Sequence, residues 1–98
     1  MNKIVFNNDY GGFYLPPHLV ARYNELAGTN YESSYDLEDN VPRHDKILVQ
    51  VVSESIDRLE RNDLAIITIK GNVYRISEYD GRETVMQPKD YTWITIGE

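Results

Sequence analysis

The chain has 98 residues, of which 41% are hydrophobic and 27% are charged, and it contains no cysteine. This length suits one domain, residues 1–98, and the absence of cysteine excludes disulfides, thiolate nucleophiles and zinc–thiolate sites. The formal net charge of -6 argues against nonspecific nucleic-acid binding, which needs clustered Lys and Arg side chains.

Hydrophobic residues are spread in short runs along the chain. None of these runs approaches the ~20 residues that span a bilayer, and the N-terminal MNKIVFNND lacks the apolar stretch of a secretory signal. We therefore expect a soluble, cytoplasmic protein with no membrane attachment.

The first half of the chain predicts a strand and then a helix. Residues 3–6, Lys-Ile-Val-Phe, predict a short strand that ends at the Asn/Asp/Gly cluster after them. The stretch PPHLVARYNELAG predicts an amphipathic helix, with proline in its first turn and Gly28 as its C-terminal cap. Its apolar residues at helical spacing are Leu19, Val20, Tyr23 and Leu26.

The middle of the chain predicts a loop and a longer helix. Residues 29–42, TNYESSYDLEDNVP, are rich in turn-formers and predict a loop, anchored to the core by Tyr31, Tyr35, Leu37 and Val41. Residues 43–63 predict a helix with Asp45 as its N-cap. One face of this helix collects Ile47, Leu48, Val51, Val52, Ile56 and Leu59.

The remainder predicts strands at residues 64–70, 73–79, 83–87 and 91–96. Gly71-Asn72 and Asp80-Gly81 are dipeptides suited to tight hairpin turns. The order β-α-α-β-β-β-β predicts an α+β fold, with two helices packed on one face of a mostly antiparallel sheet of about five strands. We expect the first strand at an edge of that sheet or beside the last strand.

The chain offers few groups for catalysis. His18 and His44 are the two histidines, and we expect His18 to lie on the surface in a first helical turn. In Arg43-His44-Asp45, a cation beside a helix start suits a carboxylate or phosphate, although an ordinary capping sequence looks the same. No spacing typical of a metal site occurs, so we expect no metal and no cofactor.

Two glycine turns carry aromatic and acidic residues. In DYGGF the glycines turn the chain sharply, so the aromatic residues either anchor the core or contact a ligand. EYDGRE repeats the arrangement, and a nucleobase could stack on Tyr10 or Tyr79 while Arg43, Arg75 or Arg82 met its phosphates. The candidate ligand site comprises Asp9, Tyr10, Gly11, Gly12, Phe13, Arg43, His44, Asp45, Tyr79, Asp80, Gly81 and Arg82.

Three stretches in this order, KIVFNNDYGGFYL, VPRHDKILVQVV and YRISEYDGRETV followed by a tryptophan, resemble a group of small proteins encoded by bacteriophages and other large DNA viruses. The likeness covers most of the chain and is weakest at residues 29–40. It implies a viral accessory protein acting in the cytoplasm of the host, and it supplies no catalytic residues. Small phage proteins commonly disable a host factor or sequester a host signalling nucleotide.

Three functions follow from these observations. The leading hypothesis is a non-enzymatic protein that sequesters a small signalling nucleotide as a counter-defence. The alternative is a protein inhibitor of a host factor, which an acidic surface with eight tyrosines would suit. A nucleotide hydrolase using His44 with Asp45 or Asp9 ranks last. Because short strands leave open sheet edges, we also expect a homo-oligomer.

Overall fold

The computed structural model describes residues 2–8, 12–55 and 64–87 of the chain. Its elements are β1 (Asn2–Asn7), α1 (Pro17–Ala27), α2 (Ser34–Asn40), α3 (Lys46–Ser55), β2 (Leu64–Ile69), β3 (Arg75–Tyr79) and β4 (Arg82–Met86). The predicted α+β class is confirmed. The strand expected at 91–96 and the helix expected over 56–63 lie outside the described residues.

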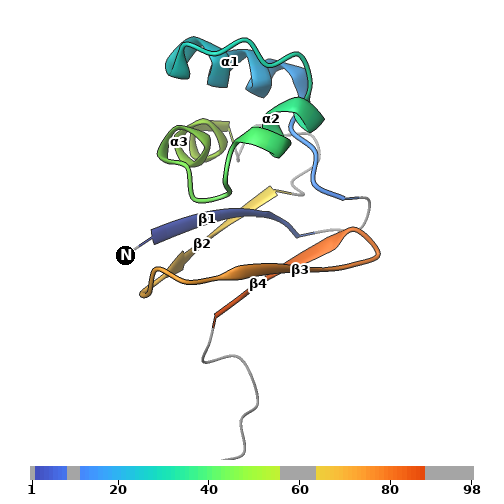
Figure 1. Cartoon of the computed structure of the whole chain (residues 1–98), viewed down its shortest axis with the longest axis vertical. Helices are drawn as coiled ribbons and strands as arrows, with labels where there is room; N and C mark the ends of the chain where they lie inside the picture. Colours follow the sequence, from blue (N-terminus) through green and yellow to red (C-terminus); the bar gives the residue numbers. More distant parts are fainter. Residues whose placement is uncertain (1, 9–11, 56–63, 88–98) are drawn as a thin grey trace, which may run out of the picture.

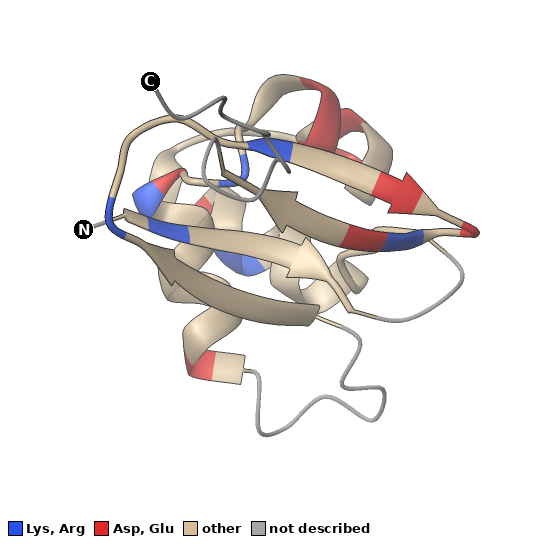
Figure 2. Ribbon diagram, turned by 90° about the horizontal axis from the view of Figure 1, so that it is seen from below, with Lys and Arg blue, Asp and Glu red and all other residues tan. Residues whose placement is uncertain are grey.

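The helices lie on one side of β1 and β2, and the β3–β4 hairpin lies on the other side (Figure 1). β1 pairs antiparallel with β2, and β3 pairs antiparallel with β4, which gives two small sheets in the described residues. Seen from the strand side, β1 runs beside β4, and basic and acidic positions are interspersed over the strands (Figure 2). The molecule therefore presents no face of one charge on this side.

Alternation along β1 divides the core in two. Val5 faces the helices and lies opposite Ile66 in the ladder, whereas Ile4 faces the hairpin and lies opposite Ile67. On the helix side the buried cluster comprises Val5, Phe13, Leu15, Leu19, Val20, Tyr23, Leu37, Val41, Leu48, Val51, Val52 and Leu64. On the other side Ile4, Ile69 and Val85 form a smaller cluster. Both faces of β1 are thus buried, and an unbroken apolar run such as Ile-Val-Phe is typical of a strand in that position.

The helix predictions are largely confirmed. α1 begins at Pro17 and ends at Gly28, whose φ of 70° gives the left-handed cap that glycine favours. In α3, Leu48, Val51 and Val52 are buried, as the spacing predicts. Leu26, which the spacing predicts on the apolar face, is exposed.

The loop predicted at residues 29–42 is wrong in its centre, where α2 makes a third helix. Ser33 caps it by accepting a hydrogen bond from the Asp36 amide, and Leu37 and Val41 are buried below it. Polar turn-formers fill most of its length, so propensity alone predicts a loop. Tertiary burial of one helical turn overrides that propensity.

The single five-stranded sheet is also wrong for the described residues. The Gly71-Asn72 hairpin does not form, because β2 pairs with β1 and β3 pairs with β4. The Asp80-Gly81 hairpin is confirmed: both residues have positive φ, 51° and 86°, between the paired Tyr79 and Arg82. That backbone is the type I′ turn for which Asp-Gly is favoured.

The edge of β1 that faces β4 explains why these neighbours form no ladder. Outward amides of β1 are bonded elsewhere: Val5 N–H donates to the Arg43 carbonyl at 2.9 Å, and Asn7 N–H donates to Glu83 Oε1 at 2.8 Å. A loop carbonyl and a carboxylate therefore take the places that β4 carbonyls would fill.

Within the described residues, no helix is long and apolar enough to cross a membrane.

Candidate functional site

The three segments that sequence reasoning combined into one site do converge. The Phe13 ring lies under the Arg43 guanidinium, with 3.6 Å between the guanidinium carbon and the ring centroid. Arg43 in turn holds Glu83 at the start of β4 through Nη1 to Oε1 at 2.6 Å and Nη2 to Oε2 at 2.9 Å. Parts of the DYGGF, RHD and EYDGRE stretches thus meet around one cation.

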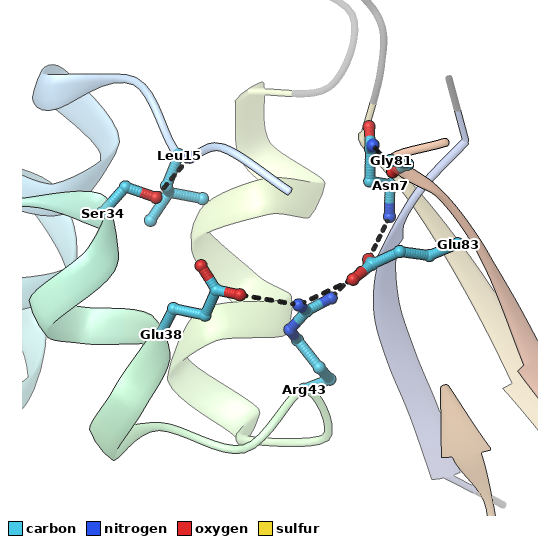
Figure 3. A network of polar contacts seen from close by, with 7 residues as sticks. All are labelled: Asn7, Leu15, Ser34, Glu38, Arg43, Gly81 and Glu83. Atoms are coloured by element: carbon cyan, nitrogen blue, oxygen red, sulfur yellow. Dashed lines mark hydrogen bonds and ion pairs between the residues drawn. The ribbon is translucent and has the colours of Figure 1, made fainter. Parts of the chain in front are cut away.

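Asn7 extends this junction to the hairpin turn (Figure 3). Its side-chain amide donates to the Gly81 carbonyl at 2.6 Å, while its backbone amide donates to Glu83. Asn7 and Glu83 are both buried. The end of β1 is therefore fixed to the turn between β3 and β4 by polar contacts.

The charge at this junction is already compensated. The Arg43 side chain is 12% exposed and lies between Glu83, 6% exposed, and Glu38, whose Oε1 is 3.4 Å from Nη2. Burial raises the pKa of Glu38, an effect that the nearby Arg43 partly opposes. A phosphate would have to displace a carboxylate to reach this guanidinium, so the geometry gives Arg43 a structural role.

His44 and Asp45 also make contacts within the protein. His44 Nδ1 lies 2.7 Å from the Tyr74 hydroxyl, with the two rings edge to face. Asp45 Oδ2 accepts from the Leu48 amide at 3.0 Å, which confirms Asp45 as the N-cap of α3, and from the Tyr23 hydroxyl at 3.1 Å. The Asp45 carboxylate is thus committed to Leu48 and Tyr23, and the imidazole of His44 to Tyr74.

The hairpin tip continues from this junction through Gly81, whose carbonyl accepts the bond from Asn7. Tyr79, 75% exposed, flanks the hairpin turn with Asp80 and Arg82, and all three face solvent. Gly12 has a φ of 88°, so a sharp turn before Phe13 is present. Asp9, Tyr10 and Gly11 lie outside the described residues. The side chains of Tyr79, Asp80 and Arg82 thus face solvent, while Gly81 and Glu83 join the same hairpin to the junction.

A groove of about 330 Å³ between α1 and α2 was not predicted. Tyr14, Tyr31 and Tyr35 are its aromatic residues; Tyr14 is 54% and Tyr35 is 73% exposed. Its walls are residues 31–35 on one side and, on the other, Tyr14, Leu15, Pro17, Val20, Ala21 and Asn24. This volume falls at the lower end of the range of about 300–1,000 Å³ for ligand sites.

Two side chains hold the groove in shape. The Asn24 amide donates to the Tyr31 carbonyl and accepts from the Tyr31 amide and the Thr29 hydroxyl, all within 2.9 Å. Buried Ser34 accepts from the Leu15 amide at 2.8 Å, next to Tyr14 (Figure 3). Tyr31 also contacts Tyr23, with 6.0 Å between ring centroids. The tyrosines are therefore carried by an internally bonded backbone, which lowers the entropy cost of binding.

The described lining of the groove presents few free polar groups. Its remaining polar groups are tyrosine hydroxyls and the Glu32 carboxylate, since Ser33, Ser34 and Asn24 are used within the protein. Neither histidine lines it. Among the described residues, no three His, Asp or Glu side chains gather as metal ligands.

Comparison with protein-family models, with curated proteins and with solved structures finds no match to this chain. The site is accordingly argued from geometry.

Sequence reasoning missed the residues that build both features. Asn7, Glu38 and Glu83 are scattered polar positions, and only the tertiary fold brings them to Arg43. Tyr31 and Tyr35 were expected as core anchors, but Tyr35 is exposed, because α2 turns it outward. The available signal was the density of tyrosine over residues 14–35.

Proposed function

We propose that this chain is a non-enzymatic binding protein that captures a protein partner in the groove between α1 and α2. The observation that carries the proposal is the exposure of Tyr14 and Tyr35 over a backbone fixed by Asn24 and Ser34. Tyrosine supplies large contact area at a low entropy cost and is enriched at protein interfaces. Exposed aromatic side chains on a fixed frame are therefore well suited to a partner surface.

The resemblance to small proteins of phages and other DNA viruses motivates the choice of partner. For an accessory protein of this kind, a host protein is the natural target. Capture alone would disable such a target, so the proposal needs no reaction.

A small signalling nucleotide, the leading hypothesis from sequence, is less well supported by the geometry. Among the described residues, no Lys or Arg lines the groove, while Glu32 does, and phosphates need cations. Arg43 is already paired with Glu83. Arg82 at the exposed hairpin tip, beside Tyr79, is the feature that still favours a nucleotide.

The proposal is tested by capture of host proteins on immobilised wild-type protein, Tyr14→Ala, Tyr35→Ala and Tyr79→Ala. Tyr79 is a matched control, because its exposure of 75% is close to the 73% of Tyr35 but it lies on β3. We expect one protein to be lost with both groove variants and kept with Tyr79→Ala. Loss with Tyr79→Ala alone would move the site to the hairpin tip.

Thermal unfolding with cyclic dinucleotides and ADP-ribose derivatives tests the nucleotide hypothesis in parallel. A ligand at a hundred times its dissociation constant adds about 2.7 kcal/mol, which raises the melting temperature by several degrees in a domain of this size. A shift abolished by Tyr79→Ala or by Arg82→Ala would favour the nucleotide over the protein partner. Recovery of the ligand intact after denaturation would show that binding involves no hydrolysis.

A further inference from the structure

We propose that the occupant of the groove is a protein segment bearing Arg or Lys, a statement that rests on the proposed binding function. The first support is the charge of the walls. Among the described residues that line the groove, Glu32 is acidic and none is Lys or Arg. The α2 helix, which supplies part of one wall, also carries the exposed Asp36 and Asp39, whereas its Glu38 is bound to Arg43. Cationic side chains complement such a surface, and anionic ones are repelled.

The nearest basic residue on α1 does not alter this balance. Arg22 is bonded to Glu25 at 2.9 Å and lies 3.6 Å from Glu54. Glu32, in contrast, is exposed and has no ion-pair partner among the described residues. The bond from Glu32 to Asp36 at the start of α2 is made by the Glu32 backbone amide and does not use its carboxylate. The carboxylate can therefore face a partner.

The second support is aromatic. A guanidinium or ammonium group placed over a tyrosine ring is attracted by the ring quadrupole. The chain itself contains this arrangement at its junction, where Arg43 covers Phe13 at 3.6 Å. In the groove, the exposed rings of Tyr14 and Tyr35 offer the same surface beside a carboxylate.

The test begins with selection of peptides from a random displayed library on wild-type protein, Tyr35→Ala and Tyr79→Ala. We expect peptides that depend on Tyr35 and not on Tyr79 to be rich in Arg or Lys. Groove-dependent peptides without a cation would overturn this inference and leave the proposed function standing. Peptides that bind equally well to Tyr35→Ala would contradict both.

A selected arginine peptide and its citrulline counterpart, which is nearly isosteric and neutral, then measure the charge directly. Their dissociation constants are compared on wild-type protein, Glu32→Gln and the control Glu78→Gln, an exposed glutamate on β3. We expect citrulline to weaken binding about two- to fivefold on wild-type protein and on Glu78→Gln, and less on Glu32→Gln. An equal loss on all three proteins would overturn the pairing with Glu32.

Discussion

Arg43 and Glu83, forty residues apart in the chain, form a two-pronged ion pair with oxygen distances of 2.6 and 2.9 Å. Their side chains are nearly buried, and the pair joins the loop before α3 to the beginning of β4. The pair thus links the helical side of the molecule to the β3–β4 hairpin. A buried pair of this kind costs most when one partner is removed.

Glu83→Ala should therefore lower the free energy of unfolding by about 3–5 kcal/mol, because it leaves the nearly buried Arg43 with only its longer ion-pair contact to Glu38 and removes the acceptor of the Asn7 backbone amide. The double variant Arg43→Met, Glu83→Leu should cost less than the two single changes added together. Urea unfolding of the wild type, of Glu83→Ala, of the single variants Arg43→Met and Glu83→Leu, and of the double variant measures both statements. Strictly additive losses would mean that the pair contributes no coupling.

Gly81→Val should destabilise the protein by at least ~1 kcal/mol, because valine is strained at the positive φ of 86°. Gly71→Ala is the matched control: its φ lies outside the left-handed region, and an added Cβ meets nothing within 4 Å. Thermal unfolding should show a clear drop for the first variant and almost none for the second. Similar drops in both would show that the turn geometry is not the cause.

Stability should fall as the pH rises from about 10 to about 12 through the ionisation of Tyr23. Burial raises the pKa of Tyr23 to about 12 from 10.0, and the Asp45 carboxylate, which accepts a hydrogen bond from the Tyr23 hydroxyl, adds to this effect. The folded state therefore keeps a proton that the unfolded chain has lost, and stability present below pH 10 disappears by pH 12, by about 1–3 kcal/mol. Tyr23→Phe lacks this proton and should show a shallower decline in urea unfolding; an identical decline would contradict the assignment.

Asn24→Ala should weaken partner capture and also cost about 1–3 kcal/mol of stability, because the backbone of Tyr31 loses both of its hydrogen bonds to Asn24. Asn40→Ala is a suitable control, since Asn40 is exposed and donates only to the Asp36 carbonyl within α2. Affinity for a groove-dependent peptide and urea unfolding separate the two effects. Unchanged affinity in folded Asn24→Ala would show that the frame does not prepare the groove.

The sequence predicts elements with strong periodicity and leaves their pairing open. Helical spacing placed α1 and α3, and Asp-Gly placed the turn between β3 and β4, because these signals are local. The pairing of β1 with β2 joins residues more than fifty positions apart, so no local pattern reports it. α2 was missed because its sequence is mostly polar. Leu37 is its one apolar residue that is buried, and a single such residue shows no helical spacing.

The candidate site was predictable in part. Convergence of the segments around Phe13, Arg43 and Gly81 was anticipated, but the partners of Arg43 decide its role. Glu83 ends the EYDGRE stretch but was not named as a site residue, and Glu38 comes from the segment that was assigned to a loop. The groove required α2, and so was not predictable once that segment was assigned to a loop. The predicted homo-oligomer stays a prediction, to be measured by light scattering.

β1 is synthesised first, yet the groups that satisfy its two edges lie at residues 43, 64–69 and 83. On a ribosome that adds about 5–20 residues each second, this strand waits several seconds for its pairing partner. Closing such long loops also slows folding relative to a helical protein of equal size. A chain released before β2 is made would therefore leave Ile4, Val5 and Phe6 uncovered, and aggregation of nascent fragments is the consequence.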